Sequence, residues 1–330
     1  MEPMKPLIEI SNLSTHFHTA AGAVKAVDGI SFRIHHGETV CIVGESGCGK
    51  SITAMSIMGL VEGPHGQVVD GQILFDDRDL LRISKEEMRR IRGNEISIIF
   101  QEPMSSLNPV LTIGKQIMEP LMLHQRLSKK QARARALELI ELVGIPRAEQ
   151  IAESYPHQLS GGMLQRIMIA IAISCRPKLL IADEPTTALD VTIQAQVLDT
   201  LRRSKEQSNM SIMLITHDLG VVAEMADYVI VMYAGKIVEQ GDVVELFENP
   251  KHPYTQGLLK SKPVIGQRKE QLYSIPGQVP NPLELSASCY FHDRCESCME
   301  ICRSQQPQLK TVRAGNQVAC WLYEEEARHE

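Results

Sequence analysis

The chain has 330 residues, enough for one large domain with an appendage or for two ordinary domains. A hydrophobic fraction of 43% and a charged fraction of 22% are typical of folded globular proteins and exclude wholesale disorder or a fibrous repeat. Lys and Arg number 34 against 40 Asp and Glu, a formal net charge of −6, so the charge balance gives no case for a dedicated nucleic-acid binder.

The sequence also bears on the compartment. No segment approaches the run of about 18 apolar residues that a membrane-spanning helix requires, and the first ten residues lack the apolar core of a secretory signal. We therefore expect the chain to stay in the cytosol. Five of the eight cysteines crowd towards the C-terminus: Cys289, Cys295, Cys298, Cys302 and Cys320. In a reducing compartment this crowding favours metal ligation over disulfides.

Short apolar runs alternate with helical patterns along most of the chain. Buried strands are predicted at 40–44, 95–100, 178–184 and 211–217, and helices at 51–60, 128–145 and 161–175. Basic residues between the apolar positions of 128–145 indicate a surface helix, whereas 161–175 is almost wholly apolar and indicates a buried one. The alternation predicts an α/β fold. After Leu259 the pattern fades into a stretch rich in Pro and Gly, so we place a domain boundary near residue 260, between 1–260 and 261–330.

One motif lies between the first predicted strand and helix. Gly44-Glu45-Ser46-Gly47-Cys48-Gly49-Lys50-Ser51 matches G-x-x-x-x-G-K-[ST]. The glycines let backbone N–H groups point at phosphate oxygens, and the helix N-terminus adds a positive partial charge. Lys50 would contact the β- and γ-phosphates, and the Ser51 hydroxyl would ligate Mg²⁺. A Gly-rich turn without a ligand is the alternative, and the strand–loop–helix context argues against it.

Two acids lie at the C-terminal end of the strand predicted at 178–184, where α/β sheets bind ligands. Asp183 suits a contact with Mg²⁺, direct or through water, and Glu184 suits the base or water-orienting residue that hydrolysis needs. No Asn is followed by Lys, so the guanine-reading N-K-x-D motif is absent from the sequence. ATP is therefore the favoured nucleotide.

Leu159-Ser160-Gly161-Gly162-Met163, followed by Gln165, precedes these acids, and here the chain resembles the ABC ATPases. It departs from the family's LSGGQ only at Met163. A hydroxyl, two exposed amides and a helix N-terminus form an anion-binding end without a Lys of its own. The resemblance implies that this end binds the ATP held by a second subunit, through Ser160, Gly161, Gly162, Gln165 and the later Asp190.

Other family elements follow in order over about residues 7–245. The resemblance assigns Phe17, after the strand LIEISNL, to stacking on adenine. It assigns Gln101 to a contact with Mg²⁺ and to sensing of the membrane subunit. Ala188-Leu189-Asp190 matches the D-loop, and His217 matches the switch histidine near the γ-phosphate. Because Glu184 and His217 are both present, we expect the ATP site of this subunit to be competent for hydrolysis.

A narrower resemblance rests on four segments: FQEPMSSLNPV (100–110), YPHQLSGGM (155–163), ADEPTTALDVTIQAQ (182–196) and HPYTQGLL (252–259). They are similar to the ATPase subunits of bacterial dipeptide and oligopeptide importers, whose close relatives carry nickel. This implies a P-loop NTPase fold of ABC type with a helical subdomain and a small Cys-rich extension. Four cysteines match those that hold a [4Fe–4S] cluster in that family: Cys289, Cys295, Cys302 and Cys320. Cys298 is additional and leaves one ligand open, and four thiolates also suit zinc.

The resemblance implies ATP hydrolysis coupled to import of di- or oligopeptides, on the cytoplasmic face of the cell membrane. The implied partners are a second, non-identical ATPase subunit, two permease subunits and, through the complex, an extracytoplasmic solute-binding protein; nucleic acid is not among them. The alternatives are an importer ATPase for nickel or another small solute, and a soluble ABC ATPase of DNA repair or translation. Only about 110 residues separate Lys50 from Leu159, which disfavours the long coiled coil of repair members. A zinc-binding interaction module could coexist with transport.

Overall fold

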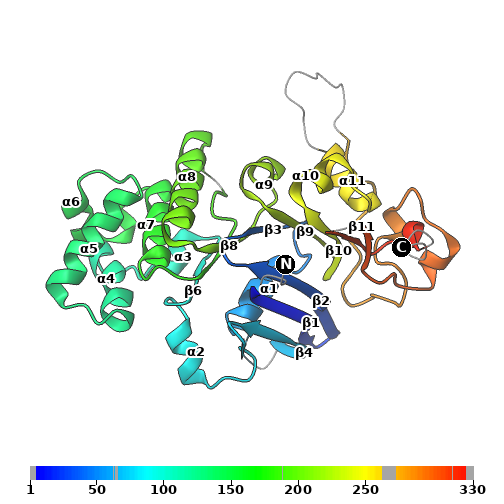
Figure 1. The fold of residues 1–330 in the computed structure, drawn as a ribbon, viewed down its shortest axis with the longest axis horizontal. Coiled ribbons are helices and arrows are strands. Elements are labelled where there is room, and N and C mark those ends of the chain that lie inside the picture. The colour runs from blue at the N-terminus through cyan, green and yellow to red at the C-terminus, as the bar shows by residue number, and fades with distance from the viewer. Residues whose placement is uncertain are drawn as a thin grey trace. The chain divides into compact units, whose positions relative to one another are not determined.

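The structure is a computed structural model that describes residues 5–61, 63, 66–187, 189–261, 273–313 and 315–324. The chain forms two compact units, and each is built from segments that are separated in the sequence (Figure 1). The helical unit consists of Lys5, Ile34–Thr39 and Arg82–Ile215. The phosphate-loop unit consists of Pro6–Arg33, Val40–Leu81 and the described residues from Thr216 onward.

Three parallel strands form the sheet of the helical unit: β6 (Ile96–Ile99), β7 (Leu179–Asp183) and β8 (Ser211–Ile215). Ile181 of β7 lies opposite Ile98 on one side and Met213 on the other. Every residue of β7 and β8 is buried, which explains why these strands are continuous apolar runs in the sequence. All three confirm the predicted strands.

The helices of this unit are α2 (Lys85–Ile91), α3 (Pro103–Ser106), α4 (Ile113–His124), α5 (Lys129–Leu142), α6 (Ala148–Glu153), η1 (Pro156–Gln158), α7 (Gly161–Ile173) and α8 (Val191–Ser208). Ser128 caps α5 through a reciprocal capping box with Gln131, and buried Ala136 and Leu139 mark its inner face. In α7, by contrast, most residues after Met163 are buried. The expected surface and buried helices are therefore both confirmed.

The phosphate-loop unit contains two sheets. One has the order β2 (Gly22–His35), β1 (Pro6–Thr19), β4 (Gly66–Phe75) and β5 (Arg78–Asp79). In the other, β3 (Thr39–Val43) is parallel to β9 (Tyr228–Tyr233), and antiparallel pairing continues through β10 (Lys236–Asp242), β12 (Asn316–Val318) and β11 (Lys310–Arg313). The end of the chain thus adds two strands to the sheet that carries the phosphate loop.

The helices of the phosphate-loop unit are α1 (Lys50–Ile57), α9 (Leu219–Met225), α10 (Val243–Glu248), α11 (Pro253–Lys260), η2 (His292–Arg294), η3 (Glu300–Arg303) and η4 (Trp321–Tyr323). The predicted linker falls largely on residues 262–272, outside the described residues. The division into 1–260 and 261–330 therefore stays a prediction. The described residues on both sides of that gap belong to the phosphate-loop unit.

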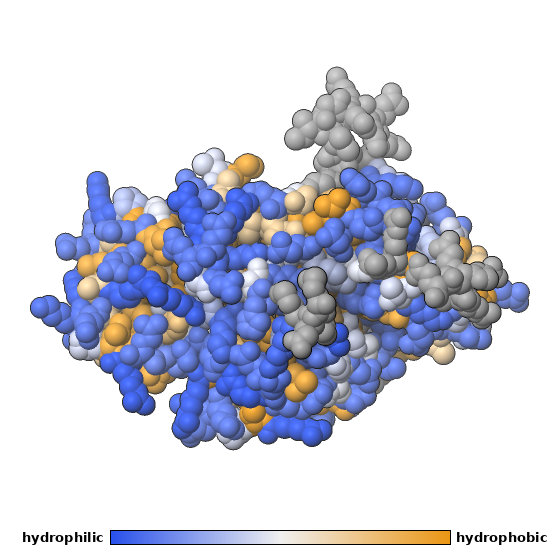
Figure 2. Space-filling view, viewed as in Figure 1, coloured by the Kyte–Doolittle hydropathy of each residue, from blue (hydrophilic) through white to orange (hydrophobic). Residues whose placement is uncertain are grey.

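The surface in Figure 2 is mainly hydrophilic, with separate hydrophobic areas. Exposed apolar side chains of the helical unit include Met104, Val110, Leu123 and Val191. Among the helices that the structure describes, none combines the length and the hydropathy needed to cross a membrane.

Candidate functional site

The predicted phosphate loop connects β3 to α1, as the motif requires. Gly44 and Gly49 have φ values of 151° and 103°, in the region that favours glycine. A Cβ on Gly44 would lie 2.2 Å from the carbonyl oxygen of Met232, and one on Gly49 would lie 2.3 Å from that of Ala26. The loop therefore packs against the backbone of β9 and β2 so closely that only glycine fits at these two positions.

Lys50 turns back into this loop. Its ammonium donates to the carbonyl oxygens of Gly44 at 2.8 Å and Glu45 at 2.9 Å, and its side chain is buried. Burial also raises the pKa of the Cys48 thiol, so this residue is neutral and adds no negative charge beside the ammonium. Ser46 and Gly47 are exposed at the tip of the loop. A positive charge and the start of α1 are thus held together, as anion binding needs.

Glu45 of the loop is held by side chains from distant segments of the chain. Its carboxylate accepts two hydrogen bonds from Arg294, at 2.7 and 3.0 Å, and its N–H donates to the Tyr254 hydroxyl at 2.9 Å. The sequence analysis did not identify Arg294 or Tyr254 as site residues. No local spacing could have identified them, since each contact joins segments more than 200 residues apart.

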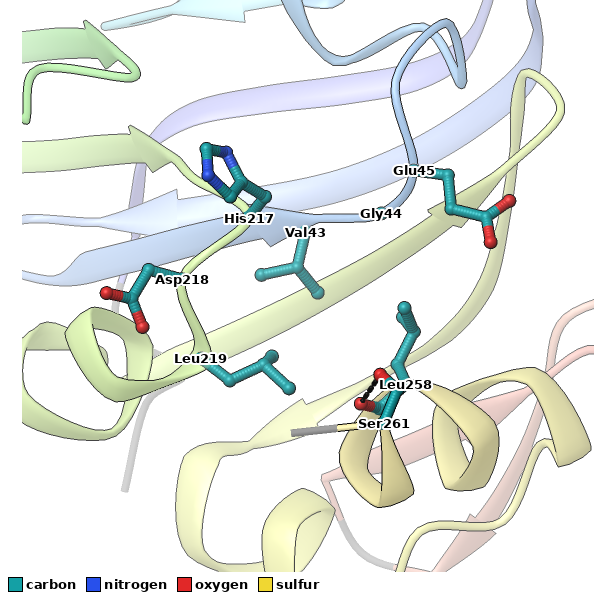
Figure 3. A pocket seen from close by; sticks show the side chains of 8 residues that line it. All are labelled: Val43, Gly44, Glu45, His217, Asp218, Leu219, Leu258 and Ser261. Atoms are coloured by element: carbon teal, nitrogen blue, oxygen red, sulfur yellow. Dashed lines mark hydrogen bonds between the residues drawn. The ribbon is translucent and has the colours of Figure 1, made fainter. Parts of the chain in front are cut away.

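A cavity of about 450 Å³ adjoins the loop (Figure 3). It is lined by Val43, Gly44, Glu45, His217, Asp218, Leu219, Leu258 and Ser261. His217 is exposed, and Asp218 caps α9 by accepting from the N–H of Gly220 at 2.8 Å. The structure therefore brings the predicted switch histidine and the start of the phosphate loop to one cavity.

Glu184 follows β7 in the helical unit and has a left-handed backbone, with φ of 48°. Such a conformation is strained for a non-glycine residue and is concentrated at functional sites. Its Oε2 accepts from the Gln101 side-chain amide at 2.9 Å and from the Thr187 hydroxyl at 2.8 Å. Asp183 is buried at the end of the strand. Two predicted site residues, Gln101 and Glu184, are thus in direct contact.

The start of α7 is open to solvent. Ser160 caps it by accepting from the N–H of Met163 at 3.4 Å, and a Cβ on Gly161 would meet nothing within 4 Å. Asp190 caps α8 in the same way, accepting from the N–H of Ile193 at 3.0 Å. The start of α7 is thus accessible to an anion from another molecule, whereas the start of α8 already holds the Asp190 carboxylate and Ala188 lies outside the described residues.

Gln165 lies on the inner side of α7. Its side chain is 2% exposed, and its Nε2 has no hydrogen-bond partner among the described residues. Its assignment to a nucleotide bound by a second subunit stays a prediction.

Phe17 lies within β1, which continues six residues beyond the predicted LIEISNL strand to Thr19. It pairs with Gly66 of β4, where a Cβ would come within 2.8 Å of the Phe17 ring. The ring is partly exposed. Its stacking on adenine stays a prediction, as does the Mg²⁺ ligand set of Ser51, Gln101 and Asp183, which is divided between the two units.

The C-terminal cysteines lie in the phosphate-loop unit, where the N–H of Cys289 donates to the carbonyl oxygen of Cys302 at 2.8 Å. Burial raises the pKa of Cys289 to about 12 and that of Cys320 to about 11, and the neighbouring thiols contribute to both shifts. However, the described residues contain no group of three or more His, Cys, Asp or Glu side chains placed to hold a metal ion. The predicted [4Fe–4S] or zinc centre is therefore not supported by the arrangement of these residues.

Sequence comparison shows what this chain resembles. Residues 27–187 match the family described as ABC transporter, and residues 238–302 match the oligopeptide/dipeptide transporter C-terminal region. The chain is 57% identical over 323 residues to the oligopeptide transport ATP-binding protein AppD of Bacillus subtilis, covering 98% of each chain. It is 49% identical over 314 residues to the dipeptide transport ATP-binding protein DppD of Escherichia coli, covering 95% of this chain and 96% of that protein.

Among solved structures, the ATP-binding cassette MJ0796, a dimer in a post-hydrolysis state with ADP and Pi, is similar with a TM-score of 0.65. The two sequences are 27% identical, and the likeness covers 72% of this chain and 98% of that chain. The predicted P-loop fold of ABC ATPase type is confirmed by this likeness and by the family match.

The contacts of Lys50 and Glu184 predict different consequences of their loss. Glu184→Gln should keep ATP affinity but lose nearly all turnover, because we expect the carboxylate to orient the attacking water and not to hold the nucleotide. Lys50→Ala should weaken ATP binding itself. Nucleotide affinity and single-turnover hydrolysis of each variant separate the two effects. Glu206→Gln, an exposed acid on α8, is the matched control, and unchanged hydrolysis in Glu184→Gln would refute the assignment.

Proposed function

The chain belongs to the ATP-binding subunits of bacterial oligopeptide and dipeptide ABC transporters, and we propose that it hydrolyses ATP to drive import of short peptides. The observation that carries this proposal is the identity of 57% over 98% of both chains to an oligopeptide transport ATP-binding protein. The intact phosphate loop and the contact between Gln101 and Glu184 add the chemistry of hydrolysis.

In this mechanism the phosphate loop binds the β- and γ-phosphates of ATP. Lys50 exchanges the carbonyl oxygens of Gly44 and Glu45 for phosphate oxygens, which are charged and therefore stronger acceptors. Ser51, Gln101 and Asp183 would hold Mg²⁺, since all three supply the oxygen ligands that this ion prefers. When bound there, the ion would supply positive charge against the charge that develops on the phosphates.

Glu184 then orients the attacking water. The hydrogen bonds from Gln101 and Thr187 fix its carboxylate, and the left-handed backbone fixes its direction from the strand end. His217, at the cavity beside Gly44, is assigned to the γ-phosphate. Phe17 is assigned to the adenine ring.

Ser160, Gly161, Gly162 and Asp190 are assigned to ATP bound by a second ATPase subunit. The support is the exposed start of α7 and the dimeric arrangement of MJ0796. We propose a homologous, non-identical partner, together with two permease subunits at the cytoplasmic face of the membrane and an extracytoplasmic solute-binding protein. The import of nickel or another small solute is the alternative function, since the transported solute does not touch this subunit.

Reconstitution tests the transport proposal. The chain, its permeases, its partner ATPase and the solute-binding protein are placed in lipid vesicles, and uptake of labelled di- and oligopeptides is measured with and without ATP. We expect ATP-dependent peptide uptake that Glu184→Gln abolishes. Uptake of a nickel complex without uptake of any peptide would favour the alternative solute instead.

The open start of α7 predicts that ATP drives association of two ATPase subunits. ATP should increase the molar mass of a mixture of this chain and its partner, and Glu184→Gln should trap the dimer because hydrolysis no longer releases it. Light scattering after size-exclusion chromatography, with and without ATP, measures the mass. A chain that stays monomeric with ATP yet retains full activity in the assembled transporter would contradict this.

We retain the cysteine centre as a proposal because Cys289, Cys295, Cys302 and Cys320 match the cysteines of the importer family and influence one another electrostatically, although the described residues show no group placed to hold a metal ion. Four thiolates suit a [4Fe–4S] cluster or zinc. The centre would stabilise the region after residue 260 and takes no part in the hydrolytic step.

Anaerobic purification of the full chain tests this centre. We expect iron and acid-labile sulfide in stoichiometric amounts, lost in Cys302→Ser and kept in Cys298→Ser, because Cys298 is the supernumerary thiol. Elemental analysis and the visible absorption spectrum provide the measurement. Stoichiometric zinc without iron or sulfide would overturn the cluster, and loss of metal in Cys298→Ser alone would show that the fourth ligand was assigned wrongly.

A further inference from the structure

Arg294, in the C-terminal segment, binds the phosphate loop through Glu45. Its side chain is 5% exposed, and its two terminal nitrogens donate to the two carboxylate oxygens of Glu45 at 2.7 and 3.0 Å. Its Nε donates to the carbonyl oxygen of Pro276 at 2.9 Å. A buried guanidinium needs hydrogen-bond acceptors, and a bidentate ion pair fixes both the distance and the orientation of the carboxylate. In Figure 3 the Glu45 side chain points away from His217.

Aromatic residues surround this ion pair. The guanidinium lies 5.7 Å from the ring centroid of Tyr233 and 5.9 Å from that of Phe291. Tyr233, Tyr254 and Phe291 also contact one another. These rings shield the guanidinium, so the attraction between Arg294, 5% exposed, and Glu45, 28% exposed, is stronger than it would be between two fully exposed groups.

A second contact runs from the same segment to the other end of the loop. The Tyr290 hydroxyl donates to Oδ2 of Asp28 at 2.8 Å. The backbone N–H of Asp28 donates to the carbonyl oxygen of Gly235 at 2.9 Å, and the N–H of Gly235 donates to the carbonyl oxygen of Cys48 at 3.0 Å. The two contacts therefore reach the phosphate loop at Glu45 and Cys48.

Tyr290 and Arg294 lie on one short turn, which contains η2. Three backbone hydrogen bonds close it: His292 to Cys289 at 3.0 Å, Arg294 to Phe291 at 3.0 Å, and Cys295 to His292 at 3.3 Å. The spacing between the two contacts is thus fixed by the turn. The turn is therefore connected to the loop at two points.

We propose that Arg294 is a positioning residue for nucleotide binding. Glu45 carries a negative charge within a loop that binds a polyanion, and an uncompensated carboxylate there would repel the phosphates. Arg294 neutralises that charge and holds the carboxylate away from the phosphate site. The C-terminal segment thereby sets the affinity of the loop for ATP. The inference rests on the proposed function only in taking ATP as the ligand.

Titration calorimetry with ATP on the full chain tests the proposal. Arg294→Met should weaken ATP binding about fivefold or more, the usual size of a coupling between sites. Adding Glu45→Gln to this variant should restore most of the affinity, because the unpaired carboxylate is then gone. The weakening should also shrink at high salt, which screens repulsion. In the assembled transporter the loss should appear in KM more than in kcat.

Arg303→Met is the matched control, since Arg303 is an exposed arginine of η3 in the same segment, and it should bind ATP like the parent chain. If Arg294→Met does not fold, Arg294→Lys keeps the positive charge without the bidentate contact to Glu45 and should still weaken ATP binding. Unchanged affinity in whichever of these variants folds overturns the proposal, as does a loss that Glu45→Gln fails to relieve. An unmodified chain that binds no ATP would refute the proposed function instead.

Discussion

The nucleotide site depends on how closely the phosphate loop packs against neighbouring backbone. At Gly44 and Gly49 the carbonyl oxygens of Met232 and Ala26 occupy the space that a side chain would need. The loop can turn its amides towards a phosphate only because β9 and β2 fix it from behind. The strands of this unit therefore define the site geometrically, and the residues that stabilise those strands act indirectly on nucleotide binding.

The loop itself supplies hydrogen-bond acceptors for its positive charge. Lys50 donates to two loop carbonyl oxygens, so a buried ammonium is not left without acceptors. In the proposed mechanism ATP replaces these neutral acceptors with phosphate oxygens, and the net gain is the difference between the two sets of hydrogen bonds. The loop is consequently preorganised in shape but must exchange partners, which limits how tightly it binds the phosphates. Because this net gain is small, charges near the loop have a large effect on the affinity for the phosphates.

The sequence predicted the parts of the fold whose pattern is local. The strands β3, β6, β7 and β8 are apolar runs, and α7 starts where Ser160 caps it, so both follow from short-range rules. The sheet of β1, β2, β4 and β5 was missed apart from one strand, because its long strands mix buried and exposed positions irregularly. The burial of Gln165 was not predicted, because this residue was assigned from the family motif and not from its position in the helical repeat of α7.

Contacts between distant segments set the limit of sequence reasoning at the site as well. The contact of Gln101 with Glu184 joins two residues that the sequence analysis assigned separately to the nucleotide site. The pair of Arg294 and Glu45 belongs to no motif, and nothing in the composition of either segment indicates it. In the sheet, β12 pairs with β10, and Glu239 of β10 accepts from the backbone of Lys251 and His252 at the start of α11. Because these contacts connect the described residues of 273–324 to β10 and to the phosphate loop, we expect those residues and the loop to unfold together in the phosphate-loop unit.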